Sequence, residues 1–206
     1  MTHSADRHRS TDLALIAAFA ALIAVCSVLP ALYLTGPVPI TLQTFAVMLA
    51  GAVLGPWRGV LAVALYLVVG FAGLPVFAGG KAGLAVLAGP TAGYIVGFLA
   101  AAMVTGVVVT LGSRLRFGSR LALGVPLLLL AAVLGVVASH ACGIAGMVWR
   151  IDGMTWAGAW HLDKVFWPGD LLKAVAVALV AAPVHRAFPG LLRGAHPAPA
   201  PERVTA

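Results

Sequence analysis

Hydrophobic runs recur along most of the chain, and short polar, glycine-rich or proline-rich segments separate them. A helix needs about 20 consecutive apolar residues to cross the hydrocarbon core of a bilayer. The runs predict six membrane helices, over residues 13–34, 41–54, 57–71, 91–111, 121–148 and 168–188. No polar module interrupts the series. The pattern therefore predicts an all-α integral membrane protein with one six-helix domain over residues 13–188.

The second and third runs are short, and their separation depends on one turn signal. Gly55-Pro56 divides a region that would otherwise form a single overlong helix. Short apolar helices are tolerated when they tilt, thin the bilayer or are shielded by their neighbours. Outside the six runs, residues 1–12 form a polar N-terminal segment. Residues 189–206 are rich in proline and alanine and are predicted to be a disordered tail.

The composition narrows the class of protein. Of the 206 residues, 62% are hydrophobic and 9% are charged, and the mean hydropathy is +1.05. About a quarter of the residues of a soluble domain are charged, so this composition excludes a water-soluble domain. A net charge of +7 in so apolar a chain indicates loops that face anionic membrane lipid. Nucleic acid is not expected as a partner, because the chain carries no nucleic-acid-binding motif.

The basic residues lie mainly in alternate connections between the predicted helices. With the N-terminus inside, the outer segments hold only Lys81, Arg150 and Lys164, and Lys173 lies within the sixth helix. The inner segments hold the other nine of the thirteen basic residues, which are Arg7, Arg9, Arg58, Arg114, Arg116, Arg120, Arg186, Arg193 and Arg203. Positive charge collects in cytoplasmic loops, so this distribution predicts six spans with both termini in the cytoplasm.

Three outer connections follow from this topology, over residues 35–40, 73–90 and 149–167. Long loops in a compact domain are usually functional or disordered. The two long connections are too apolar and aromatic for disorder, since they contain Leu74, Val76, Phe77, Leu84, Trp156, Trp160 and Trp167. They predict a lid or a binding site on the outer side. The alternative, in which the tryptophans form an aromatic belt at the membrane interface, stays open.

Asp170 and Lys173 stand out at the start of the sixth helix. Residues three apart share one face of a helix, so the two side chains are expected to lie together. Ionisable residues within membrane spans are costly and are often functional. The alternative is a carboxylate near a helix N-terminus with a local ion pair, in which Lys173 extends outward to the interface.

Two other helix starts carry uncharged polar groups. Thr41 and Gln43 open the second helix, and Tyr94 follows the start of the fourth helix at Pro90-Thr91. These groups are candidates for ligand contacts, and helix capping is the alternative for Thr41 and Gln43. Gly93 permits close approach of a neighbouring helix.

The first helix has a face of small residues. Ala14, Ala17, Ala18, Ala21 and Ala24 follow steps of three and four, which keep them on one side of a helix. Small residues let membrane helices approach closely. The face can serve a partner protein, or it can pack within the same bundle.

The chain shows no enzyme signature. Ser139-His140 lies within an apolar run without a GxSxG motif or a third partner. His140, His161 and His185 lack the spacing of zinc ligands, and Cys26 and Cys142 lie in apolar runs with no metal or disulfide pattern. A Walker A motif is also absent, so the chain does not hydrolyse ATP in the manner of P-loop proteins. No catalytic residue, metal or cofactor is predicted.

Four segments resemble the signature segments of the BioY family. They are Val38-Pro-Ile-Thr-Leu-Gln43, Gly73-Leu-Pro-Val-Phe77, Gly89-Pro-Thr-Ala-Gly-Tyr94 and Pro168-Gly-Asp-Leu-Leu-Lys173. The resemblance covers about residues 13–188. BioY proteins are the biotin-specific S components of energy-coupling factor (ECF) transporters. The resemblance therefore implies high-affinity biotin capture and uptake across the bacterial cytoplasmic membrane.

The resemblance also implies an architecture and partners. Biotin is expected near the outer face, under the loops between helices one and two and between helices three and four. The alanine face, with Ala14, Ala17, Ala18 and Ala21, is expected to dock on a transmembrane coupling subunit. Two ATPase subunits complete such an importer, and transport involves toppling of the S component in the bilayer.

By the same resemblance, Asp170 and Lys173 are the leading polar ligands of biotin. A carboxylate accepts hydrogen bonds from ureido N–H groups, and a lysine binds an anion. Tyr94 is expected to stack on the bicyclic ring, Thr41 and Gln43 to close the site, and Lys81 to contribute from its glycine-rich loop. Two alternatives remain, an S component for another vitamin and a self-contained secondary transporter with broken helices or repeats.

Overall fold

The computed structural model describes residues 2–29, 40–115 and 124–193. These ranges are helical apart from turns, short connections and isolated bridge residues, among them the pair Phe77 and Lys81. In chain order the α-helices are α1 (Thr2–Val28), α2 (Gln43–Leu54), α3 (Pro56–Phe71), α4 (Ala92–Leu115), α5 (Val125–Arg150), α6 (Trp156–Asp163) and α7 (Trp167–Ala187). Three short 3₁₀ helices are η1 (Ala78–Gly80), η2 (Leu84–Ala88) and η3 (Leu191–Arg193).

The helices correspond to the six hydrophobic runs, with two differences. α1 begins at Thr2, so most of the polar N-terminal segment continues the first helix. The outer connection over residues 149–167 was expected to be a loop, and it contains the short helix α6. The sequence signal for α6 is weak because eight residues show little hydrophobic periodicity. The expected ends of the first and fifth helices at residues 34 and 121, and Val38 of the outer connection, lie outside the described residues.

Four helices in the described ranges are long and apolar enough to cross a membrane. They cover Arg9–Val28, Ala92–Ser113, Val125–Arg150 and Trp167–Ala187. α2 and α3 have 12 and 16 residues, which correspond to lengths of about 18 and 24 Å at 1.5 Å per residue. Both are shorter than the hydrocarbon core of about 30 Å. The structure thus shows a multi-helix membrane protein, while six complete spans stay a prediction.

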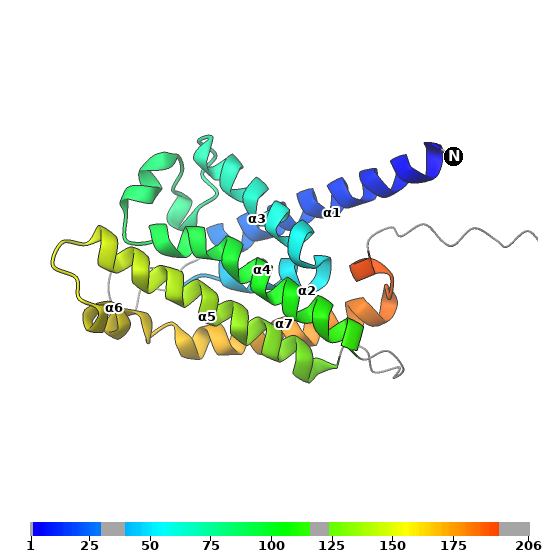
Figure 1. The fold of residues 1–206 in the computed structure, drawn as a ribbon. Helices are drawn as coiled ribbons and strands as arrows, with labels where there is room; N and C mark the ends of the chain where they lie inside the picture. The colour runs from blue at the N-terminus through cyan, green and yellow to red at the C-terminus, as the bar shows by residue number, and fades with distance from the viewer. Residues whose placement is uncertain (1, 30–39, 116–123, 194–206) are drawn as a thin grey trace, which may run out of the picture.

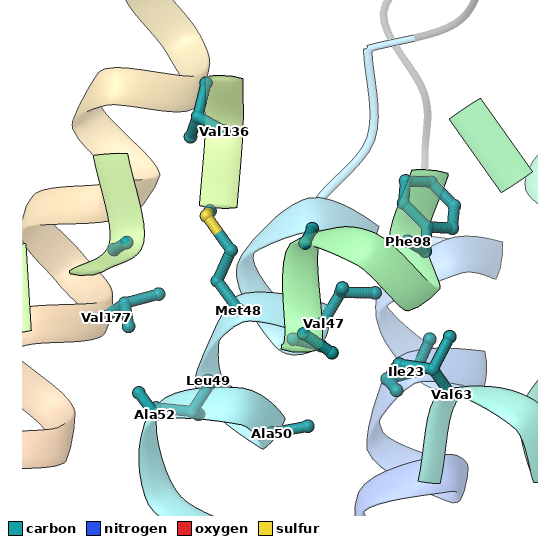
Figure 2. Packing of buried hydrophobic residues seen from close by; sticks show 14 of the residues in the cluster. Ile23, Val47, Met48, Leu49, Ala50, Ala52, Val63, Phe98, Val136 and Val177 are labelled. Atoms are coloured by element: carbon teal, nitrogen blue, oxygen red, sulfur yellow. The ribbon is translucent and has the colours of Figure 1, made fainter. Parts of the chain in front are cut away.

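The helix α2 lies at the centre of the bundle. It contacts α1, α3, α4, α5 and α7, and ten of its twelve residues are buried. Figure 2 shows Met48 reaching from α2 toward Val136 of α5, with Val47 near Ile23 and Val63. Because its neighbours surround it, α2 does not need to match the thickness of the bilayer.

Glycines bring α4 and α5 close together. A Cβ atom added at Gly93 would lie 2.3 Å from the carbonyl oxygen of Cys142. One added at Gly146 would lie 2.4 Å from Cα of Gly93. The expectation of close approach at Gly93 is confirmed. The tight contact fixes the start of α4, where the candidate residue Tyr94 lies.

The described connections lie at two ends of the bundle (Figure 1). At one end Arg58, after the α2–α3 turn, pairs with Asp12 of α1 at 2.7 Å and also donates to the carbonyl oxygen of Leu191. The start of α1 and the end of α7 lie at this end, and α6 lies at the other. This grouping agrees with the predicted alternation of inner and outer segments. Of the arginines assigned to the inner side, Arg116, Arg120 and Arg203 lie outside the described residues, and the side chains of Arg7, Arg114 and Arg193 are not described.

The alanine face of α1 points away from the bundle. Ala14, Ala17, Ala18 and Ala21 are exposed, whereas Ala20 and Ile23 belong to the core. The alternative in which these four alanines pack within the bundle is therefore wrong. Ala24 differs from them, because it is half-buried and packs against the core.

Candidate functional site

A pocket lies between the start of α2, the segment after α3, and the starts of α4 and α7. Its empty volume is about 670 Å³, part of which is open to the outside. Sites for small molecules typically combine an apolar wall with a few polar groups. The apolar wall here consists of Ile40, Phe77, Val86, Ile95, Phe98 and Phe166. The pocket therefore has the lining of a small-molecule site.

All six residues that the sequence analysis singled out as ligand contacts line this one pocket. They are Thr41, Gln43, Lys81, Tyr94, Asp170 and Lys173. They come from segments that are far apart in the sequence, so the fold brings them together. Their roles in binding stay predictions.

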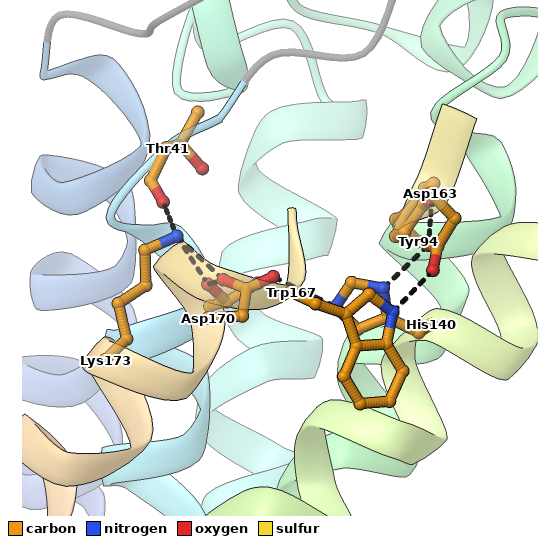
Figure 3. Close-up of polar contacts among 8 residues, drawn as sticks. Thr41, Tyr94, His140, Asp163, Trp167, Asp170 and Lys173 are labelled. Atoms are coloured by element: carbon orange, nitrogen blue, oxygen red, sulfur yellow. Dashed lines mark hydrogen bonds and ion pairs between the residues drawn. The ribbon is translucent and has the colours of Figure 1, made fainter. Parts of the chain in front are cut away.

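Asp170 and Lys173 form an ion pair on the pocket wall. Lys173 Nζ lies 2.8 Å from Asp170 Oδ1, and the two side chains are 12% and 7% exposed. Lys173 also donates to the carbonyl oxygen of Thr41 at 2.5 Å and to Thr44 Oγ1 at 3.2 Å. Figure 3 shows the lysine directed toward Thr41 and Asp170. The alternative in which Lys173 extends outward to the interface is therefore wrong.

The local sequence explains the placement of this pair. Pro168 occupies the first turn of α7, where its missing N–H removes no helical hydrogen bond. Asp170 lies in the same first turn, where the helix dipole favours a carboxylate. Lys173 follows one turn later on the same face, within reach of the carboxylate. Thr44 of α2 donates to Asp170 Oδ1 at 2.8 Å and ties the pair to the central helix.

A buried polar network extends from this ion pair, and we define it as Tyr94, His140, Asp163, Trp167, Asp170 and Lys173. His140 of α5 lies 3.0 Å from Asp170 Oδ2 through Nε2 and 2.6 Å from Asp163 Oδ1 through Nδ1. Tyr94 donates to Asp163 Oδ1 at 2.6 Å, and Trp167 Nε1 donates to Oδ2 at 2.8 Å. Figure 3 shows the network running continuously from Lys173 to Asp163.

Gln43 and Thr41 are also held by contacts within the protein. Gln43 Nε2 donates to the hydroxyl of Tyr66 at 2.7 Å, and that hydroxyl lies 3.2 Å from Ser27 Oγ and from the carbonyl oxygen of Val76. Thr41 Oγ1 accepts from the backbone N–H of Gln43 at 3.3 Å. Thr41 thus contacts the first residue of α2 and lines the pocket, but the N-cap residue is Leu42, so neither Thr41 nor Gln43 occupies the capping position.

Phe77 anchors the segment that carries Lys81. Its ring fills the space beside Gly70, where an added Cβ would lie 2.3 Å from the ring. The ring meets Tyr66 edge-on at a centroid distance of 5.5 Å. The backbone N–H of Gly83 donates to the carbonyl oxygen of Gly70 at 2.8 Å. These contacts hold the exposed Lys81 where it lines the pocket.

A model of the BioY family matches residues 1–190, which include every described part of the pocket and the network. The chain belongs to the BioY family.

Two relatives show how far the similarity extends. The biotin transporter BioY of Rhodobacter capsulatus is 42% identical over 191 residues, covering 88% of this chain and 96% of the relative. The biotin transporter BioY of Rhizobium etli is 41% identical over 181 residues, covering 86% and 95%.

A solved structure shares the fold of this BioY family member. The crystal structure of the S-component for biotin from an ECF-type ABC transporter matches with a TM-score of 0.78 at 26% identity. The match covers 90% of this chain and 95% of the other. The family is one of transporters, so this BioY family member is a multi-pass membrane transport protein and not an enzyme.

Sequence reasoning missed four polar residues of the site, namely Thr44, Tyr66, His140 and Asp163. His140 was considered only as a zinc ligand or a catalytic base, and its partners lie 23 and 30 residues away. A signal was available, because an ionisable side chain within an apolar run is costly and needs a partner. No group of three potential metal ligands occurs in the part of the chain that the structure describes.

Proposed function

We propose that this BioY family member binds biotin in the described pocket and imports it as the S component of an ECF-type transporter. The observation that carries the proposal is the largely buried Asp170–Lys173 pair on the wall of a mainly apolar pocket. Two relatives of more than 40% identity are named biotin transporters, and the matching structure is an S-component for biotin.

The lining of the pocket suits the chemistry of biotin. Biotin has a ureido group with two N–H donors and one carbonyl acceptor, an apolar thioether ring and a carboxylate on an aliphatic chain. Asp170 offers carboxylate oxygens to N–H donors, and Lys173 offers N–H donors to an acceptor. Tyr94 already donates its hydroxyl to Asp163, which leaves its ring for contact with the bicyclic part of the ligand. Lys81 gives the pocket a second cation for an anionic group.

The arrangement in the membrane is part of the proposal. Six helices lie in the cytoplasmic membrane of a bacterium, with both termini in the cytoplasm. The end of the bundle with Arg58 and η3 faces the cytoplasm, and the pocket faces outward. The basic residues of the inner segments support this orientation, because positive charge collects in cytoplasmic loops. The polar residues 1–12 and the tail 189–206 are cytoplasmic in this arrangement.

The alanine face of α1 is the proposed docking surface for the transmembrane coupling subunit. Ala14, Ala17, Ala18 and Ala21 are exposed on a helix whose opposite face belongs to the core. Small side chains permit the close helix contacts that stabilise complexes within a bilayer. ATPase subunits bound to the coupling subunit then supply the energy for import.

The test of this function is equilibrium binding of biotin to the purified chain in detergent, with Asp170→Asn and Lys173→Ala beside the wild type. Each change removes one charge of the ion pair and one of the charged groups that line the pocket. We expect Kd to rise by at least about 30-fold, which corresponds to about 2 kcal/mol. Lys164→Ala is the matched control, because Lys164 is an exposed lysine near the same end that does not line the pocket. It should bind like the wild type.

Three outcomes decide between the functions. Saturable binding that only the two pocket variants weaken supports biotin capture at this site. A folded wild type that does not bind biotin refutes the assignment, and other vitamins measured in the same assay then test the alternative S component. Biotin uptake by the reconstituted chain without any coupling module would favour a self-contained transporter.

A further inference from the structure

Asp163 is a fully buried carboxylate that the proposed binding chemistry does not use. It is 0% exposed, ends α6 and does not line the pocket. Its two oxygens meet groups from three other helices, namely Tyr94 of α4, His140 of α5 and Trp167 of α7. Burial of a carboxylate is strongly unfavourable unless it is paired and hydrogen-bonded. This degree of pairing indicates a specific role for Asp163.

His140 connects this carboxylate to the pocket. Its ring nitrogens lie 2.6 Å from Asp163 Oδ1 and 3.0 Å from Asp170 Oδ2. When both carboxylates are ionised, each ring nitrogen donates to its partner, because an ionised carboxylate accepts hydrogen bonds and donates none. In that state His140 carries a hydrogen on both nitrogens, and the positive charges of His140 and Lys173 balance the negative charges of Asp163 and Asp170.

The network holds both oxygens of Asp170. His140 bonds to Oδ2, while Lys173 and Thr44 bond to Oδ1. With both oxygens held, the carboxylate cannot rotate, and Lys173 keeps a fixed partner. Asp170 and Lys173 line the pocket, whereas His140 does not.

We propose that His140 and Asp163 are positioning residues that hold Asp170, and through it Lys173, in the geometry required to bind biotin. Asp163 fixes the orientation of His140, and His140 fixes the carboxylate of Asp170. A site prepared in this way loses less conformational entropy when the ligand binds. The inference rests on the proposed biotin-binding function and adds two residues that do not touch the ligand.

Three variants of the full chain test this role by equilibrium biotin binding in detergent. His140→Gln removes the bond to Asp170, and Asp163→Asn removes the charge that orients His140. Each should raise Kd by about tenfold or more, the size of effect that the hydrogen-bond partners of metal ligands have on metal affinity. Trp167→Phe keeps an aromatic ring and removes one of the donors to Asp163. It should raise Kd by a smaller factor.

His185→Gln is the matched control for loss of a buried histidine. His185 lies on α7, is 6% exposed and bonds to the carbonyl oxygen of Ala52 at 2.9 Å, but it does not line the pocket. The Kd of the His185→Gln variant for biotin should stay within about twofold of the wild-type value. This should hold even if the melting temperature of His185→Gln falls as much as that of His140→Gln. A merely structural role of His140 would give the two histidine variants the same Kd.

A spectroscopic measurement tests the network without biotin. In ¹⁵N-histidine-labelled protein, the His140 signal, identified by its loss in His140→Gln, should show a hydrogen on both ring nitrogens. A hydrogen on only one of the two ring nitrogens would contradict the charge arrangement.

The binding measurements have their own deciding outcomes. If His140→Gln and Asp163→Asn bind biotin with the same Kd as the wild type, the positioning role is refuted. If these two variants do not fold, an unchanged Kd in Trp167→Phe overturns it instead. A wild type that does not bind biotin refutes the proposed function, while the spectrum still tests the network.

Discussion

At the scale of single residues, the site is already hydrogen-bonded within the protein. Lys173 reaches three acceptors, and Asp170 meets donors on both of its oxygens. These contacts keep two charges in a largely buried position at low cost, because each is paired. A ligand that binds there must share these groups, and the fixed geometry makes the site selective for a matching set of donors and acceptors.

Thr44 offers a test of this preorganisation. Its hydroxyl donates to Asp170 and accepts from Lys173, so Thr44→Val removes both bonds and keeps the shape of the side chain. We expect weaker biotin binding and a loss of about 1–3 kcal/mol in the free energy of unfolding, because buried charged groups lose partners. Titration with biotin and thermal unfolding in detergent measure the two effects.

Thr105→Val is the matched control for this substitution. Thr105 is fully buried, and its hydroxyl has no hydrogen-bond partner among the described residues. Replacement by valine should leave both affinity and stability unchanged, or raise stability slightly. A larger loss in Thr105→Val than in Thr44→Val would contradict the importance given to the Thr44 bonds.

At the scale of the elements, α2 and the α4–α5 pair determine where the pocket forms. α2 is short and contacts five other helices, so its start carries Thr41 and Gln43 into the interior of the bundle. The glycines between α4 and α5 let the helix backbones approach closely enough to place Tyr94 beside His140 and Asp163. Backbone contact of this kind is a feature of membrane helix packing.

Substitution of one glycine tests the α4–α5 contact. Gly93→Ala places a Cβ 2.3 Å from the backbone oxygen of Cys142, and backbone atoms cannot move aside as a flexible side chain can. We expect the free energy of unfolding to fall by about 1–3 kcal/mol, as is typical of overpacked interiors. Biotin should raise the melting temperature of this variant less than that of the wild type, because Tyr94, which lines the pocket, lies next to the contact. Thermal unfolding with and without biotin measures both effects.

Gly169→Ala is the control for the glycine experiment. Gly169 lies within α7, and an added Cβ there would have no atom within 4 Å. Alanine is more favourable than glycine in a helix by up to about 1 kcal/mol, so this variant should be as stable as the wild type or more stable. Equal stability of the two alanine variants would refute the proposed role of Gly93.

At the scale of the whole molecule, the pocket and the proposed docking surface are separate. The pocket is built from α2, α4, α7 and the segment after α3, whereas the exposed alanine face belongs to α1. Substrate binding and complex assembly should therefore be separable by mutation. This separation is useful for a binding subunit, because the isolated chain can capture its ligand before energy is supplied.

Ala18→Leu tests the separation. A leucine on the exposed face should prevent close approach of a partner helix. Biotin binding to the isolated chain should stay within about twofold of the wild type, since the pocket does not include α1. Cellular biotin uptake and copurification of the coupling subunit should fall. Ala141→Leu, at an exposed alanine of α5, is the control and should keep uptake. Loss of uptake in both variants would contradict a docking surface specific to α1.

Local features of the sequence predicted most of the helices, one contact of the candidate site and the family. Apolar run lengths and the Gly55-Pro56 turn predicted the described ends of α2, α3, α4, α5 and α7 to within a few residues, because helix formation in a bilayer depends on the local run of side chains. The prediction was wrong for the start of α1, which begins at Thr2 and not at residue 13. The spacing of Asp170 and Lys173 predicted their contact, because residues three apart on a helix are neighbours. Four short motifs identified the family, which the family model and the relatives confirm.

Only the tertiary structure decided the rest. The bond between His140 and Asp163 joins residues 23 positions apart, and no local periodicity encodes such a pair. The packing of helices placed α2 at the centre and turned Lys173 toward the pocket. It also left the alanines of α1 uncovered. Sequence periodicity shows which residues share a face, whereas the neighbour that a face meets depends on the packing of the whole bundle.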